Sequence, residues 1–395
     1  MTESADVTTR PLYLHVGTRK SGTTSLQGAL KASRPALLRE GVNHPFNSRP
    51  QHMKKVLAPM LALGAGDGEQ GREGIRELVD TLREAPGDRL LLTLEDLAEM
   101  PEEPVARLLE VLSTDFEVHV VVTARDWSKQ IPSEWQQLVK SRMTLPYDEF
   151  ATAVREQRAD VELFRLRQHL PGIARRWSQG LPPEQLHVIA VPSPKREPMG
   201  LYDLFSGLVG YDPAVLEISR GSRNTSLGYE QAEVLRQVNV ALGDRLSDVR
   251  GQYRPVVRRL LINGPLRKQE GLSLGLPTGH VDWVRAESMA MLEELRAAGH
   301  DILGDPDDLM PSQSAPTMDV AVDSDIIAQV AVQALADVVV RSSRSDDRFV
   351  PARRRTPKQP RRAVTAPPPA PAGPARRAVR AARRAADRAR RRIRR

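Results

Sequence analysis

The sequence lacks cysteine altogether among its 395 residues. Disulfide bonds, thiolate zinc sites and a cysteine nucleophile are therefore excluded. No continuous apolar run approaches the roughly 20 residues that a membrane span requires, and the first ten residues, MTESADVTTR, lack the apolar stretch of an export signal. With 40% hydrophobic and 27% charged residues, the composition is ordinary for a soluble protein, so we expect a cytoplasmic location.

Several catalytic motifs are missing as well. The chain has no G-x-S-x-G nucleophile elbow, which removes the α/β-hydrolase interpretation. No group of His and carboxylate residues has the spacing of a metal site, so no metal is expected. The Walker pattern of nucleotide triphosphatases, G-x-x-x-x-G-K-[ST], is met only in part: Gly17 and Gly22 have its spacing, but Thr23 stands at the Lys position.

Charge is distributed unevenly along the chain. The formal net charge is +8, yet residues 351–395 hold sixteen Arg, one Lys and one Asp, so the first 350 residues sum to −8. Arg, Ala and Pro dominate this end of the chain, and the near absence of large apolar side chains predicts a disordered tail over 342–395. Arg at such density attracts nucleic acid, anionic membrane or an acidic partner; an appendage without a ligand is the alternative.

Short β-rich runs alternate with segments of helical periodicity over the first 310 residues. The predicted strands are 12–17, 89–94, 117–124 and 186–191. The helices predicted between them are 24–32, 71–84, 103–112, 128–141 and 147–157. Such alternation favours an α/β domain with a mostly parallel sheet flanked by helices on both faces.

The pattern after the fourth strand is helical. Apolar residues recur at helical spacing over 201–209, 229–242, 256–262 and 282–298. Residues 304–325 are acidic and rich in turn residues, which indicates the edge of the domain, and one amphipathic helix is expected at 326–340. The chain is thus predicted to comprise an α/β domain over 1–310, a linker and helix over 311–341, and the tail.

The most informative stretch is LYLHVGTRKSGTTSLQGAL, residues 12–30. A buried strand ends at Gly17, a loop follows, and a helix begins near Thr24. Unpaired backbone N–H groups at a helix start lie at the positive end of its dipole and bind phosphate. Gly22 permits close approach of the backbone, and Lys20 adds a mobile positive charge. The loop is therefore a candidate anion site; a Gly/Thr-rich turn without a ligand is the alternative.

This loop resembles the 5′-phosphosulfate-binding loop of sulfotransferases that use 3′-phosphoadenosine 5′-phosphosulfate (PAPS). The loop of that family reads approximately K-[ST]-G-T-[ST]-[ST], and KSGTTS at 20–25 fits it. The resemblance implies a P-loop-like sulfotransferase fold and a Lys20 that contacts the bridging oxygen and the sulfuryl group. It also implies that the 5′-phosphate is held by the backbone amides of Ser21, Gly22, Thr23, Thr24 and Ser25.

A second motif follows the strand EVHVVVTA. Arg125 leaves this strand and Ser133 comes eight residues later, the spacing with which the family binds the 3′-phosphate. A guanidinium presents a fork to phosphate oxygens, and a hydroxyl adds a further hydrogen bond. The alternative for Arg125 is a surface ion pair with Asp126 or Glu134. Trp127, beside Arg125, is expected in the core, with contact to adenine as its alternative.

The resemblance extends over roughly residues 11–310, through PGIARRWSQGLPPEQLHVIAVPSP (171–194) and NTSLGYEQAEVLRQVN (224–239). Familiar members of the family close over the nucleotide with a late R-K-G. The nearest segment here is RGSRN at 220–224, which has no Lys.

Sulfuryl transfer to an alcohol requires a base near the acceptor, and Glu or His is the usual choice. Glu95 follows the strand RLLLTL, at the carboxyl edge of the sheet where ligands of open α/β folds bind, so it is the first candidate. His52 is the second candidate. His15, on the first strand, is more simply a core residue.

The function expected from the resemblance is transfer of a sulfuryl group from PAPS, the co-substrate, to the hydroxyl or amine of an acceptor such as a carbohydrate or small metabolite. The first alternative is a P-loop phosphotransferase or hydrolase that uses ATP and magnesium. The second is a non-catalytic nucleotide-binding scaffold with a polyanion-binding tail. The position of Lys20 outside the Walker pattern counts against the first, and two complete nucleotide motifs count against the second.

Overall fold

The computed structural model describes residues 9–46, 48–218, 226–246, 252–312, 316–319 and 323–346. The RGSRN segment at 220–224 and tail residues 347–395 lie outside these ranges.

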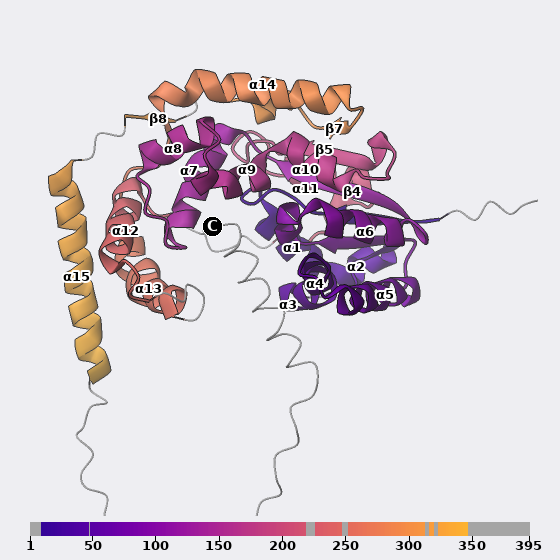
Figure 1. Cartoon of the computed structure of the whole chain (residues 1–395), viewed down its shortest axis with the longest axis horizontal. Coiled ribbons are helices and arrows are strands. Elements are labelled where there is room, and N and C mark those ends of the chain that lie inside the picture. Colours follow the sequence, from indigo (N-terminus) through magenta and orange to yellow (C-terminus); the bar gives the residue numbers. More distant parts are fainter. Residues whose placement is uncertain are drawn as a thin grey trace, which may run out of the picture.

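A six-stranded sheet forms the centre of the protein (Figure 1). Its order is β2-β3-β1-β4-β5-β7, and every neighbouring pair is parallel. The strands are β1 (Arg10–His15), β2 (Val42–Asn43), β3 (Arg89–Thr93), β4 (Phe116–Ala124), β5 (Leu186–Ala190) and β7 (Asp301–Leu303). In the central register Leu14 lies between Leu92 and Val120. The predicted α/β class with a parallel sheet flanked by helices is therefore confirmed.

The two faces of the sheet carry separate apolar clusters. On one face Tyr13, Leu91 and Val121 pack against three helices, α1 (Thr23–Ala32), α2 (Arg34–Arg39) and α11 (Gly200–Val209). On the other face Leu14, Leu92 and Val120 belong to the larger cluster. Its helices include α5 (Gly68–Glu84), α6 (Glu102–Leu112), α7 (Trp127–Val139) and α10 (Leu170–Trp177). Successive side chains of a strand point to opposite faces, so these nearly continuous apolar strands are buried on both sides.

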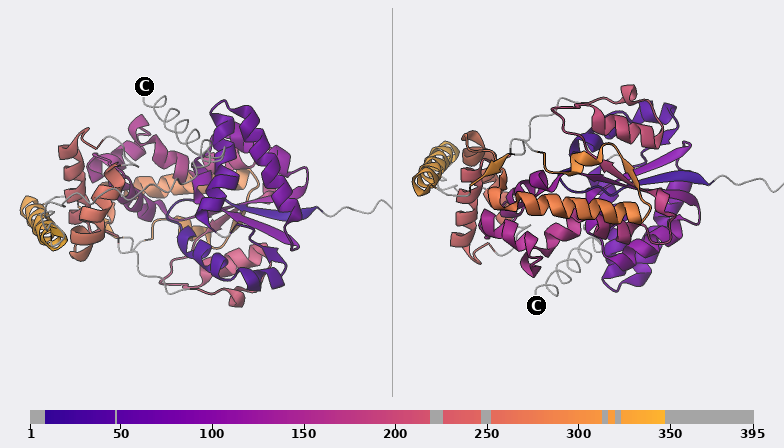
Figure 2. Two further views of the ribbon diagram at one scale, coloured as in Figure 1. Left: turned by 90° about the horizontal axis from the view of Figure 1, so that it is seen from below. Right: turned by 90° about the horizontal axis from the view of Figure 1, so that it is seen from above.

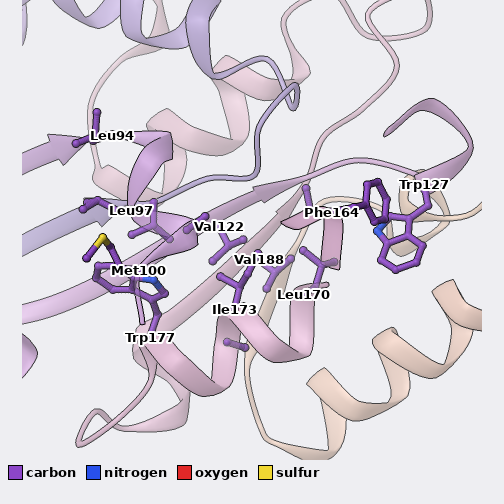
Figure 3. Packing of buried hydrophobic residues seen from close by; sticks show 14 of the residues in the cluster. Leu94, Leu97, Met100, Val122, Trp127, Phe164, Leu170, Ile173, Trp177 and Val188 are labelled. Atoms are coloured by element: carbon purple, nitrogen blue, oxygen red, sulfur yellow. The ribbon is translucent and has the colours of Figure 1, made fainter. Parts of the chain in front are cut away.

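Figure 3 shows part of the larger cluster. Ile173 and Trp177 of α10 lie beneath Val122 of β4 and Val188 of β5. Trp127 packs edge-on against Phe164 of α9 (Glu162–Gln168), with ring centroids 5.1 Å apart, and its indole N–H donates to the Gln168 carbonyl at 3.1 Å. Trp127 is therefore a core residue, as predicted.

The connection that leaves β1 lies on the opposite face of the sheet from the connections that leave its two neighbours, β3 and β4. The chain leaves β1 into α1 on one face, but it leaves β3 and β4 on the opposite face, into the 3₁₀ turn η2 (Glu95–Glu99), α6 and α7. In open α/β sheets a crevice forms outside the carboxyl ends of the strands at such a point. The loop at 16–22 lies there.

The second half of the chain is largely helical, and most of it adds a layer beyond the carboxyl ends of the strands, whereas the helix at 281–297 runs back alongside the sheet to β7 (Figure 1). Its elements are α8 (Tyr147–Arg155), α12 (Tyr229–Leu242), α13 (Arg254–Val257), the π-helical segment η7 (Arg258–Leu266), α14 (Val281–Ala297) and α15 (Ser324–Asp346). The stretch predicted as an edge and linker, 304–325, is partly packed: Leu309 is buried, and β8 (Thr317–Met318) pairs with β6 (Leu276–Pro277). The last helix also continues beyond its predicted end at 340.

One helix in the described part of the chain is long and apolar enough, by length and composition, to cross a membrane. It is Ser324–Ser343 within α15, with a mean hydropathy of 1.4 and 17% of the segment buried. Ser, Asp and Gln interrupt its apolar residues, which is why the sequence has no continuous run there.

Candidate functional site

The loop between β1 and α1 has an unusual backbone. Gly17, Lys20 and Gly22 all have positive φ, of 52°, 68° and 89°. The positive φ favours glycine at position 22, and a Cβ there would lie 2.9 Å from Leu201 Cδ2, so the Leu201 side chain would have to shift. For Lys, a left-handed conformation costs roughly 1–2 kcal/mol. Such strain persists where the surrounding structure imposes it, and it concentrates at functional sites.

The loop is anchored to β4 at its start and leaves its later amides without partners. Val16 and Thr18 donate their backbone N–H groups to the carbonyls of Val121 and Thr123, at 3.0 and 2.9 Å. The N–H groups from Lys20 to Thr24 have no acceptor within the described part of the chain. Gly22 is the N-terminal capping residue of α1, and no side chain caps the helix. These amides are therefore free to bind an anion.

The hydroxyls of the loop divide into two groups. Ser21 and Thr23 are buried, and Ser21 Oγ donates to the Thr18 carbonyl at 2.7 Å. Thr24 and Ser25 are exposed, and Ser25 Oγ lies 2.6 Å from the Tyr202 hydroxyl. Of the five residues predicted to hold a phosphate, only Thr24 and Ser25 present their side chains outward; Ser21 and Thr23 can contribute only their backbone.

A buried hydrogen-bond chain holds the loop from behind, through His15. Its Nδ1 lies 2.8 Å from Thr93 Oγ1, its Nε2 lies 3.1 Å from Thr123 Oγ1, and Thr123 Oγ1 lies 2.8 Å from Ser21 Oγ. Since Ser21 donates to a carbonyl, Thr123 must donate to Ser21, and the Nε2–H of His15 must donate to Thr123. Burial lowers the pKa of His15 to about 4, so the ring is neutral. His15 is thus a structural support for the loop.

The second predicted motif meets the first. Arg125 Nη1 donates to the Lys20 carbonyl at 2.8 Å, which joins residues 105 positions apart in the chain. Its sequence alternatives are both engaged elsewhere: Asp126 caps α7 through Ser128, and Glu134 binds Arg167. Burial lowers the pKa of Arg125, and the nearby charge of Asp126 only partly offsets this.

Ser133 lies two turns into α7 and is half-buried. Its hydroxyl has no hydrogen-bond partner in the ranges that the structure describes. It is therefore free to form a hydrogen bond with a ligand, but within the described chain no hydrogen bond joins it to Arg125 or to the loop.

Glu95 is the first residue of η2 and lies two residues after the end of β3, just beyond the strand as the sequence predicted. Its Oε2 accepts from Gln27 of α1 at 2.8 Å, and its Oε1 accepts from Arg49 of α3 (Arg49–His52) at 2.5 Å. Burial alone would raise the pKa of Glu95, but the hydrogen bond from Gln27 and the charge of Arg49 outweigh it and the net direction is downward. Glu95 is therefore ionised, with each oxygen already accepting one hydrogen bond.

Further charges extend this pair into a network. Arg49 also binds Asp96, and Arg19 of the loop binds Asp96 and Glu99. Arg167 lies 2.8 Å from Glu99 as an ion pair. Arg19, next to Lys20, therefore ties the loop to η2.

His52, the second candidate base, is buried beside His44 and Phe46. Its Nδ1 lies 3.2 Å from the Ser48 carbonyl, so Nδ1 carries the proton and Nε2 is the unprotonated atom. That Nε2 is buried without a hydrogen-bond partner in the described chain. Burial lowers the pKa of His52, while the Ser48 carbonyl and the charge of Glu95 oppose the shift.

Lys140, the C-terminal capping residue of α7, was missed by the sequence analysis. Burial and then the like charges of Lys20, Arg267 and Arg258 lower its pKa to about 8. Neither Lys20 nor Lys140 forms an ion pair within the described chain. Because Lys20 and Lys140 are close enough to repel each other, the site is electropositive. The position of Lys140, seven residues after Ser133, was the feature of the sequence that could have indicated it.

No group of three or more His, Asp or Glu side chains within the described ranges is arranged to hold a metal ion. Comparison of the chain with protein-family models, with curated proteins and with solved structures found no match in any of the three.

Proposed function

We propose that the chain binds PAPS at the loop and transfers its sulfuryl group to a hydroxyl or amine of an acceptor molecule. The observation that carries this proposal is the hydrogen bond from Arg125 to the Lys20 carbonyl. It brings together two motifs that resemble the two phosphate-binding motifs of PAPS-dependent sulfotransferases. The free loop amides can donate hydrogen bonds to phosphate oxygens, and the unpaired Lys20 and Lys140 add positive charge beside them.

In the proposed reaction the acceptor oxygen attacks sulfur in line, a new S–O bond forms, and the S–O bond to the 5′-phosphate breaks. Lys20 stabilises the charge that develops on the bridging oxygen, and the amides of 21–25 hold the 5′-phosphate. Arg125 and Ser133 hold the 3′-phosphate. The acceptor's proton passes to the base, and adenosine 3′,5′-bisphosphate leaves.

Two residues compete for the role of base. Glu95 is ionised at neutral pH, but Arg49 and Gln27 occupy it and reduce its basicity. His52 offers an unprotonated and unpartnered Nε2, although it is buried. Glu95→Gln and His52→Asn distinguish them, because only loss of the base should remove transfer while leaving nucleotide affinity unchanged.

Ligand-dependent thermal stability tests the nucleotide assignment. A ligand that binds only the folded chain stabilises it by about 2.7 kcal/mol at a hundred times its dissociation constant. Adenosine 3′,5′-bisphosphate should raise the unfolding midpoint more than AMP, without metal. A larger shift with ATP and magnesium would contradict the proposal and favour a phosphotransferase.

Arg125→Ala makes the test selective. It should weaken adenosine 3′,5′-bisphosphate about ten- to hundredfold, the value of a charged set of hydrogen bonds, while AMP binding hardly changes. Ser133→Ala should act in the same direction with a smaller effect. Arg107→Ala, which removes an exposed ion pair on α6, is the matched control. Because Arg125 also contacts the Lys20 carbonyl, equal losses for both nucleotides would mean that it supports the loop rather than the 3′-phosphate.

A further inference from the structure

The last helix, α15, has two apolar faces, and only one of them is covered. It packs on α12 and η7, where Ile327, Val330 and Ala334 are at most 9% exposed. Arg341 donates to the Arg259 carbonyl and Gln269 to the Val330 carbonyl, so the helix is tied to the domain. Figure 1 shows α15 at the outer edge of the molecule beyond α12, and both views of Figure 2 place it at the same edge.

Several large apolar side chains of α15 are exposed. Twelve such residues are exposed in the described part of the chain, and five of them belong to this one helix. They are Ile326 (42% exposed), Val332 (66%), Leu335 (64%), Val339 (62%) and Val340 (47%). Ala328, Val332, Leu335 and Val339 are spaced by four, three and four residues, so they form one stripe along the helix. Ile326 and Val340 lie at the margins of the covered face, so we call Ala328, Val332, Leu335 and Val339 the outer face of α15.

The outer face is almost free of charge. Between residues 326 and 340 the only ionisable side chain is Asp337. Contiguous exposed apolar surface of this kind marks an interaction site rather than ordinary solvent-facing structure.

The sequence after α15 is strongly basic. Residues 341–350 hold three Arg and two Asp, and residues 351–395 then carry a net charge of +16, whereas the first 350 residues sum to −8. An apolar helix face and a basic segment are therefore adjacent in the chain. Amphipathic helices next to basic clusters bind anionic lipid surfaces through both features at once.

We propose that the outer face of α15 binds an anionic lipid membrane, with α15 lying in the plane of the interface, and that the positive charge of the sequence after it favours anionic over neutral lipid. Nucleic acid would use the positive charge but not the apolar face. A second copy of the chain would use the apolar face, but in a parallel pair it would bring two segments of +16 together. A spanning helix would have to leave α12 and η7. This proposal is independent of the proposed sulfuryl transfer.

The test uses the full chain and sedimentation with vesicles of phosphatidylcholine alone or with 30% phosphatidylserine. We expect binding to the anionic vesicles at least tenfold tighter than to the neutral ones. The pair Val332→Asp and Leu335→Asp should reduce it at least tenfold, and so should removal of 347–395. The pair Leu163→Asp and Met289→Asp, which places the same charges on exposed apolar positions of α9 and α14, should leave it unchanged.

Three results would overturn the proposal. Unchanged lipid binding in the Val332→Asp and Leu335→Asp variant would make the basic segment a general polyanion binder. A dimer of the wild type in sedimentation equilibrium that this variant converts to monomer, without lipid binding by either, would make the outer face a contact between two copies. Retention of wild-type chain on vesicles after an alkaline wash would indicate a spanning helix. The substituted side chains are exposed, so an unchanged unfolding midpoint serves as the folding control.

Discussion

At the scale of single residues, Lys20 combines a strained backbone with an ammonium group that has no carboxylate partner in the described chain. A core role would require neither property. We predict that Lys20→Ala lowers sulfuryl transfer from PAPS about a hundredfold or more, the usual cost of removing a contact aimed at the transition state. Lys20→Gly should lose as much activity yet raise the free energy of unfolding by about 1 kcal/mol, because glycine adopts positive φ without strain.

Lys31→Ala is the control for both variants, since this exposed Lys lies on α1, the helix that follows the loop. Transfer rates with a panel of carbohydrate and small-molecule acceptors, together with urea unfolding, measure the two effects. Undiminished transfer in Lys20→Ala would remove this residue from the mechanism.

Lys140 gives a prediction that depends on pH. Its pKa of about 8 lies below the value of about 10.4 for a free Lys, so between these pH values the unfolded chain binds more protons than the folded one. The contribution of Lys140 therefore makes the folded state more stable as pH rises from about 8 to about 10.4, and its full cost is present below 8. A bound phosphate favours the charged form, so binding of adenosine 3′,5′-bisphosphate at pH 8 should take up protons.

Calorimetry in two buffers of different ionisation enthalpy measures this proton uptake. Lys140→Met should reduce it sharply and Lys31→Met should not. The same uptake in Lys140→Met and the wild type would place the titrating group elsewhere.

At the scale of secondary-structure elements, Arg167 of α9 joins α7 and η2. It binds Glu134 at 2.6 Å and Glu99 at 2.8 Å, and Glu134 is fully buried. Removing one partner of a buried ion pair leaves an uncompensated charge, so Arg167→Met should lower the free energy of unfolding by about 3–5 kcal/mol. Arg158→Ala, which breaks two half-exposed pairs, should leave the free energy of unfolding nearly unchanged. Equal effects in urea unfolding would contradict a buried network.

A double variant separates charge from packing. Adding Glu134→Leu to Arg167→Met removes the orphaned carboxylate, so most of the lost stability should return.

The elements that the sequence predicted well are the long ones. The predicted helices at 103–112 and 229–242 and the strand at 117–124 agree with the structure to within a residue. The strands β2 and β7 were missed because two or three residues show no periodicity. Lys20 and Arg125 meet because both follow the carboxyl ends of β1 and β4, which are neighbours in the sheet, and this strand order was not predicted from the sequence. The inward turn of Ser21 and the network around Arg167 were not predicted either, because they depend on contacts between residues 33 to 102 positions apart.

At the scale of the whole molecule, α15 divides the C-terminal region into a packed part and the segment after it. Cutting the chain after Asp346 should leave the thermal midpoint nearly unchanged, because residues 347–395 hold few large apolar side chains. Cutting before Ser324 also removes Ile327 and Val330, and at about 1.5 kcal/mol or more for each buried side chain it should cost about 3 kcal/mol. Equal midpoints for the two truncations, measured by calorimetry, would show that α15 adds nothing to the domain.

The short outer strands of the sheet, β2 and β7, affect whether the protein aggregates before or after it unfolds on heating. With only two residues in β2 and three in β7, the folded sheet offers few free backbone groups to which a foreign strand could add, so native molecules should resist joining edge to edge. Once unfolded, the chain exposes LLLTL and VHVVVT, which are apolar, β-prone and free of proline. Aggregation of the unfolded chain should then be faster than its refolding. We therefore expect thermal unfolding to be irreversible and the apparent midpoint to depend on the heating rate.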